Sequence, residues 1–142
     1  MDSRLSTPWL ALRLGIGLTA TLAGLDKFFN LLTNWSTYVS PLAAQMLPFS
    51  TTTFMGIVGI VEIAVGIAVL TAWTRLGAYV ASAWLILVAL NLALAGYFDI
   101  AVRDVVMSIG AFTLARLTEV RQGVHVNSHV PTPNYQPVPH SR

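Results

Sequence analysis

The chain has 142 residues, too few for more than one domain of ordinary size. Apolar residues make up 55% of it and charged residues only 10%, whereas an average soluble domain has roughly 25% charged residues. The net charge of +2, without any cluster of Lys and Arg, gives no sign of a nucleic-acid partner. Because there is no cysteine, disulfides, thiol chemistry and iron–sulfur clusters are excluded for this chain.

Four apolar segments follow one another along the chain, and each comes close to the ~20 residues that a bilayer-spanning helix needs. Their approximate bounds are 8–29, 51–73, 76–98 and 102–117. Arg13 interrupts the first segment and no small-residue cleavage site follows it, so we interpret that segment as a retained span and not a signal peptide. The fourth segment is the shortest and begins with Arg103 and Asp104, which we expect at the membrane interface.

Basic residues near the ends of the spans predict the orientation of the chain. With the N-terminus inside, the cytoplasmic side receives Arg4, Arg75, Arg116 and Arg121, and the other side only Lys27 and Arg103. We therefore predict an all-α integral membrane four-helix bundle, N-in and C-in. We expect it in the cell membrane, which for a bacterium is the inner membrane.

The connection between the first two spans, residues 30–50, carries no charge and contains Trp35, Tyr38, Pro41 and Pro48. Aromatic side chains of this kind favour the headgroup region of a bilayer. We predict a short helix that lies in the interface and covers the mouth of the bundle; the alternative is a plain connecting loop.

The composition changes after the fourth span. We assign residues 1–122 to the membrane domain and residues 123–142 to a tail rich in proline and histidine, disordered unless a partner binds it. The tail contains His125, His129 and His140, but their irregular spacing without other ligands does not favour a metal site.

Small residues recur at helical spacing and define one face on three of the spans. On the first span Gly17, Ala20 and Gly24 lie between Arg13 and Lys27. On the second, Gly59 and Gly66 flank Glu62. On the fourth the face consists of Asp104, Ser108, Ala111 and Ala115. Such faces permit close helix approach, so we expect all three to point into the bundle.

Polar side chains inside a membrane usually face the bundle interior and pair with one another. The predicted network comprises Arg13, Lys27, Glu62, Asn91, Arg103 and Asp104. Arg13 and Glu62 differ in depth by roughly 8–9 Å at ~1.5 Å per residue, and we predict that they pair. Toward the other side we predict pairing of Lys27 with Asp104, or of Asp26 with Arg103.

Two interpretations of this network stay open. In the first, the charges pair and fix the register of the bundle, as polar contacts commonly do in membranes. In the second, Glu62 and Asp104 are candidate catalytic residues that exchange protons with a small lipophilic substrate such as a quinone.

The residues Arg13-Leu14, Gly17 and Ala23-Gly24-Leu25-Asp26-Lys27-Phe28 resemble the first helix of the DoxX-like membrane proteins. The pattern of Gly59, Glu62 and Gly66 is similar to their second helix, and Arg75-Leu76-Gly77 to their short inner turn. This resemblance covers residues 10–117 and implies a four-helix membrane fold. It also implies a redox-associated role, because some members are subunits of a thiosulfate:quinone oxidoreductase and others serve in defence against oxidative stress.

Our leading hypothesis is an accessory subunit of a membrane redox or electron-transfer assembly, without a cofactor of its own and without catalytic activity alone. Its expected partners are the lipid bilayer and other membrane subunits, and any electrons come from a partner or a diffusible quinone. The alternatives are a quinone-interacting oxidoreductase component and a small transporter or channel.

Overall fold

The computed structural model describes residues 3–128, and their side chains as far as Gly123. The described chain is entirely helical: α1 (Ser3–Phe29), a 3₁₀ helix η1 (Trp35–Tyr38), α2 (Pro41–Met46), α3 (Thr51–Leu70), α4 (Thr74–Leu94) and α5 (Phe98–Ser128). Among them α1, α3 and α4 are long and apolar enough to cross a membrane. These three helices indicate a membrane protein.

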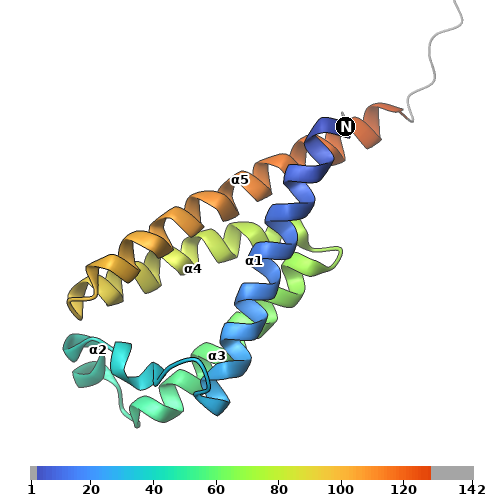
Figure 1. The fold of residues 1–142 in the computed structure, drawn as a ribbon. Coiled ribbons are helices and arrows are strands. Elements are labelled where there is room, and N and C mark those ends of the chain that lie inside the picture. Colours follow the sequence, from blue (N-terminus) through green and yellow to red (C-terminus); the bar gives the residue numbers. More distant parts are fainter. Residues whose placement is uncertain (1–2, 129–142) are drawn as a thin grey trace, which may run out of the picture.

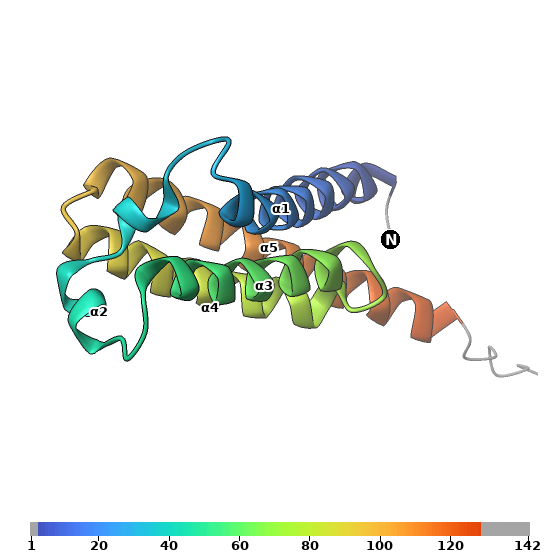
Figure 2. The same cartoon turned by 90° about the horizontal axis from the view of Figure 1, so that it is seen from below.

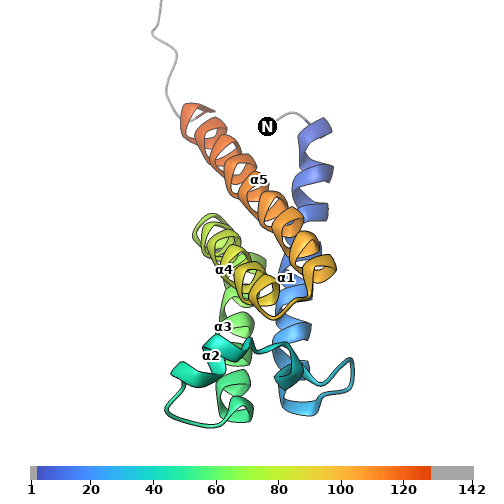
Figure 3. The same cartoon turned by 90° about the vertical axis from the view of Figure 1, so that its left-hand side faces the viewer.

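The long helices form two pairs, α1 with α3 and α4 with α5. Figure 1 shows that the pairs come together near the start of α1 and diverge toward the side where α2 lies. We call the first side the closed end and the second the open end. Figure 3 faces the open end, where α1 and α3 lie side by side and α5 crosses at an angle to them.

Glycines bring α1 and α3 into backbone contact. A methyl group added to Gly24 would lie 2.6 Å from the carbonyl oxygen of Gly59, and one added to Gly59 would lie 2.7 Å from the carbonyl oxygen of Gly24. Gly17 and Gly66 face each other in a second contact of this kind, which lies closer to the closed end. The small faces predicted for the first two spans are therefore packed against each other, which allows close van der Waals contact without a gap.

The pair of α4 and α5 is also built on small residues. Ala78, Ala81, Ala111 and Ala115 are almost fully buried there. The hydroxyl of Ser108 donates to the carbonyl of Ser82 at 2.8 Å, so the polar atoms of this contact are satisfied within the pair. The face predicted on the fourth span is thus buried, with its four members between 0% and 5% exposed.

At the closed end, polar side chains join elements that are distant in sequence. The indole N–H of Trp9 on α1 donates to the hydroxyl of Thr118 on α5 at 2.9 Å. The guanidinium groups of Arg13 and Arg121 lie over the same indole, 5.0 and 4.1 Å from its centroid. Cations over an indole face are attracted by its quadrupole, so this cluster ties α1 to α5.

The turn between α4 and α5 ends the third span earlier than predicted. Gly96 has a φ of 87°, and the backbone N–H groups of Tyr97 and Gly96 donate to the carbonyls of Leu92 and Ala93. This is the Schellman arrangement, which needs a residue in the left-handed region and therefore favours glycine. The predicted span of 76–98 consequently divides into the end of α4 at Leu94, a turn, and the start of α5.

The connection between α1 and α3 contains two short helices, η1 and α2, where one was expected. Ser40 begins α2, since its hydroxyl oxygen accepts from the backbone N–H of Ala43 at 3.2 Å, and Pro41 occupies the first helical position. Ser50 caps α3 in the same way. Figure 2 shows α2 on the side of the molecule formed by α3 and α4.

Helix α5 is much longer than the segment 102–117 from which it was predicted. It begins at Phe98 and continues past Gly123 to Ser128, so the first part of the predicted tail is helical. The sequence signal stopped early because the apolar run ends at Leu117, whereas the helix continues through polar residues that suit an exposed surface. His129 and His140 lie outside the described residues.

Candidate functional site

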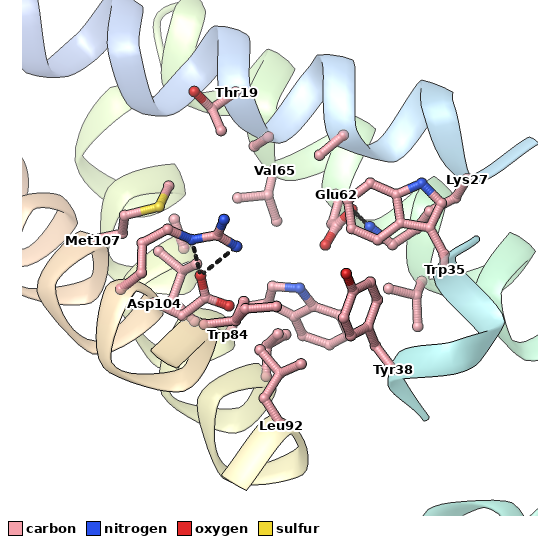
Figure 4. Close-up of a pocket in the computed structure, with 18 of the residues that line it drawn as sticks. Thr19, Lys27, Trp35, Tyr38, Glu62, Val65, Trp84, Leu92, Asp104 and Met107 are labelled. Atoms are coloured by element: carbon pink, nitrogen blue, oxygen red, sulfur yellow. Dashed lines mark hydrogen bonds and ion pairs between the residues drawn. The ribbon is translucent and has the colours of Figure 1, made fainter. Parts of the chain in front are cut away.

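A cavity of about 700 Å³ lies between the two helix pairs, from the open end to the middle of the molecule. Its walls come from the helices α1, α3, α4 and α5 and from the connection that contains η1 (Figure 4). Apolar side chains form most of the surface, among them Ile16, Ala20, Ala23, Met55, Val58, Val65, Leu85, Val88, Leu92 and Met107. A concave and largely apolar site with a few polar groups is typical of a small-molecule binding site.

Lys27 and Glu62 form an ion pair on the wall made by α1 and α3. Lys27 Nζ lies 2.5 Å from Glu62 Oε2, and the two side chains are 5% and 14% exposed. The indole ring of Trp35 covers the ammonium group at 3.8 Å from its centroid. Because an unpaired charge in apolar surroundings is very costly, each member of this pair offsets the burial of the other.

A second ion pair lies on the opposite wall. Arg103 Nε donates to Asp104 Oδ1 at 3.3 Å, and the Asp104 side chain is 7% exposed while that of Arg103 is 64% exposed. In Figure 4 the two carboxylates, Glu62 and Asp104, face the cavity from its two sides. The structure thus brings together the two residues proposed for proton exchange, each with a basic partner of its own.

Trp84 on α4 lies between the two ion pairs in Figure 4, with its indole nitrogen directed toward the cavity. That nitrogen is buried and has no acceptor in hydrogen-bonding geometry among the described residues, while the Glu62 carboxylate lies close enough to interact with it more weakly. Buried indole N–H groups usually have a partner, because an unsatisfied buried donor costs about 1–3 kcal/mol. A ligand carbonyl or hydroxyl in the cavity would supply the missing acceptor.

The open end of the cavity is covered by the segment that follows α1. Asp26 holds its beginning, because its carboxylate accepts from the backbone N–H groups of Leu31 and Leu32 and from the indole N–H of Trp35 at 2.8–3.0 Å. Asn91 on α4 holds its end, since its side chain accepts from the Ser40 N–H at 3.0 Å and donates to the Tyr38 carbonyl at 2.8 Å. Asn91 therefore bridges α4 to this connection.

The predicted pair of Arg13 and Glu62 is wrong. Arg13 donates to the carbonyls of Val69, Leu70 and Thr71 at 2.6–3.1 Å and so caps the C-terminal end of α3. Those carbonyls have no partner within the helix, and a cation suits the negative end of the helix dipole.

The two pairs predicted for the other side are also wrong. Lys27 pairs with Glu62 instead of Asp104, and Arg103 pairs with its neighbour Asp104 instead of Asp26. Across the cavity the two walls are held apart, so each charge finds its partner on its own wall. Among the residues that the structure describes, Asp26 forms no ion pair and serves the turn after α1 through its hydrogen bonds.

Sequence reasoning missed the aromatic residues of the site. Sequence reasoning would place Trp84 in helix packing, and it placed Trp35 and Tyr38 at the membrane interface. A signal existed for Trp84, because an indole in the middle of a span needs an acceptor for its N–H and the third span has few polar side chains. For Trp35 the contact with Lys27 depends on the fold of the connection, which no local pattern shows.

Comparison of the chain with protein-family models, with curated proteins and with solved structures gives no match. The resemblance to DoxX-like proteins therefore stays a prediction that rests on the sequence motifs alone.

Proposed function

We propose that this protein is a four-helix membrane protein in which residues 102–117 of α5 form the fourth span and both termini face the cytoplasm. The charges support this orientation. Arg75 and Arg116 both pair with Glu119, and Arg121 lies over the Trp9 indole at the closed end, whereas Lys27 and Arg103 line the cavity. An excess of Arg and Lys on one side marks the cytoplasmic face. Membership of the DoxX-like family, proposed from the motifs of α1 and α3, agrees with such a bundle.

We propose further that the protein binds a quinone in the cavity between its helix pairs. The observation that carries this proposal is the buried Trp84 N–H, which makes no hydrogen bond within the described part of the chain and faces an apolar cavity between two carboxylates. A quinone ring has an apolar body and two carbonyl oxygens, so it fits the walls and accepts from the indole. The corresponding quinol has two hydroxyl groups, which donate to Glu62 and Asp104.

Reduction of a quinone to a quinol takes two electrons and two protons. Glu62 and Asp104 are suited to pass the protons, because both carboxylates reach the cavity and each has a basic partner that accommodates a change of charge. The electrons come from a partner protein that carries a flavin or haem, so we propose a component of a membrane redox assembly. In this proposal the accessory-subunit hypothesis and the quinone-site hypothesis describe one protein.

The test is quinone binding to purified protein in lipid nanodiscs, measured by calorimetric titration. Replacing Trp84 by Phe should weaken quinone binding about two- to tenfold, since one hydrogen bond contributes about 0.5–1.5 kcal/mol. Trp73→Phe is the matched control, because Trp73 is 65% exposed and does not line this cavity. Absence of saturable quinone binding to the unmodified protein would refute the proposed function.

A further inference from the structure

The exposed residues of the cavity lining are unevenly distributed among the helices. Among the residues that line it, the exposed ones are Thr19 and Leu22 on α1, Leu32 just after α1, and Arg103 on α5. Every lining residue from α3 and α4 is buried or half-buried. The cavity therefore reaches the surface of the molecule between α1 and α5, and it is closed between α3 and α4.

The contacts between helices explain this asymmetry. Between α3 and α4, the turn after α3 keeps the helices together at the closed end, and α2 and η1 pack against α4 and α3 near the open end. Between α1 and α5 contact is made toward the closed end, where a methyl group added to Gly110 would lie 3.8 Å from Leu12 and 3.9 Å from Ile16. Beyond that point the two helices diverge, as Figure 1 shows, and α2 lies on the other side of the molecule in Figure 2.

The opening suits an apolar chain. It is bordered by Thr19 and Leu22 on α1 and by Arg103 and Met107 on α5, whereas the ion pair of Lys27 and the indole N–H of Trp84 lie deeper inside. Helix faces exposed at this depth of a membrane protein meet lipid chains and not water. A ligand that enters here comes from the bilayer, with its polar group held inside and its apolar part toward the lipid.

We propose that the gap between α1 and α5 is a lateral portal, and that the ligand is a quinone with a long apolar tail. The ring occupies the cavity between Glu62, Trp84 and Asp104, and the tail passes between Thr19 and Met107 into the bilayer. This inference rests on the proposed quinone function and adds the substrate class and the route of entry.

The first experiment compares a long-tailed quinone with the same ring without a tail, titrated against protein in nanodiscs. Thr19→Trp places an indole in the portal and should weaken binding of the tailed quinone about tenfold, as overfilling of a packed site does. Binding of the tail-less quinone should stay within the error of the measurement. Leu18→Trp is the matched control, because Leu18 is next to Thr19 in the sequence, is 49% exposed and does not line the cavity.

A second measurement locates the tail without relying on a substitution. A quinone with a photoreactive diazirine on the first carbons of its tail should label residues 16–23 of α1 or 100–107 of α5. Labelling confined to the segment 31–38 would place the tail at the open end and overturn the portal. The portal would also be overturned if Thr19→Trp weakened binding of both quinones equally, or weakened binding of neither. If the unmodified protein binds neither quinone, the proposed function itself fails.

Discussion

The contact between Gly24 and Gly59 should be highly sensitive to substitution. In a Gly24→Ala protein the new methyl group would lie 2.6 Å from the Gly59 carbonyl oxygen and 2.9 Å from the backbone nitrogen of Ile63. Both neighbours are backbone atoms of α3, so no side-chain rotation relieves the clash and the two helices must separate. Overpacking of this kind costs about 1–3 kcal/mol.

The assay is reversible unfolding in mixed micelles, in which the fraction of SDS is raised and helix content is followed by circular dichroism. Gly24→Ala should raise the unfolding equilibrium constant about 5- to 150-fold relative to the unmodified protein. Gly15→Ala is the control on the same helix, because nothing lies within 4 Å of the position where its methyl group would stand. Alanine favours a helix over glycine by about 1 kcal/mol, so that control should be as stable as the parent or more so.

Equal stability of Gly24→Ala and Gly15→Ala would refute the close approach of α1 and α3. The consequence would reach the site, because this approach also holds Lys27 against Glu62. A methyl group added to Gly59 would lie 3.2 Å from Lys27 Cβ, so the contact surface of the two helices includes the base of the Lys27 side chain.

Two further predictions concern charge pairs. Lys27→Met should lower the free energy of unfolding by about 3–5 kcal/mol, because it leaves the buried Glu62 carboxylate unpaired. The double variant with Glu62→Gln should regain much of that loss in the same SDS titration; additive losses would contradict the pair. Glu119 lies beyond the proposed fourth span, and the Tyr79 hydroxyl, followed by Arg116 and Arg75, lowers its pKa below the usual value. A lowered folded-state pKa stabilises the protein above the unfolded value of about 4.3, and this contribution is lost as the pH falls through the folded pKa. Glu119→Gln should therefore be less stable than the parent at pH 7 and equal to it near pH 2 in thermal unfolding. A difference that does not change with pH would contradict this assignment.

Local patterns in the sequence predicted the helices and the faces that pack, because both depend on residues that are close along the chain. The small faces on α1, α3 and α5 follow from helical spacing alone, and all of them are used in helix contacts. The helix boundaries were less well predicted where a turn or a polar helix surface decided them. Gly96 ends α4 inside a continuous apolar run, and α5 continues after its apolar run has ended.

The charge pairs were mispredicted because depth in the membrane was the only criterion. Two residues at similar depth meet only if their helices are adjacent and in the right register. The register was present in the sequence, since Gly17 and Gly24 have the same spacing as Gly59 and Gly66. Matching these glycines in antiparallel order places Arg13 opposite Leu70, which is where the structure has it.

The cavity follows from the same packing, and one of its side chains does not serve stability. Small residues hold α1 to α3 and α4 to α5 so closely that the space left over lies between the pairs. The charges that face this space are paired on their own walls, but the indole N–H of Trp84 is not. Phe has no buried donor, so it removes a cost of about 1–3 kcal/mol, which offsets the packing that is lost because its ring is smaller than an indole. A Trp84→Phe protein should therefore bind quinone more weakly and yet unfold no more easily than its parent. Weaker binding without a loss of stability is what replacement of a residue selected for its ligand produces, whereas replacement of a residue selected for packing would lower both together.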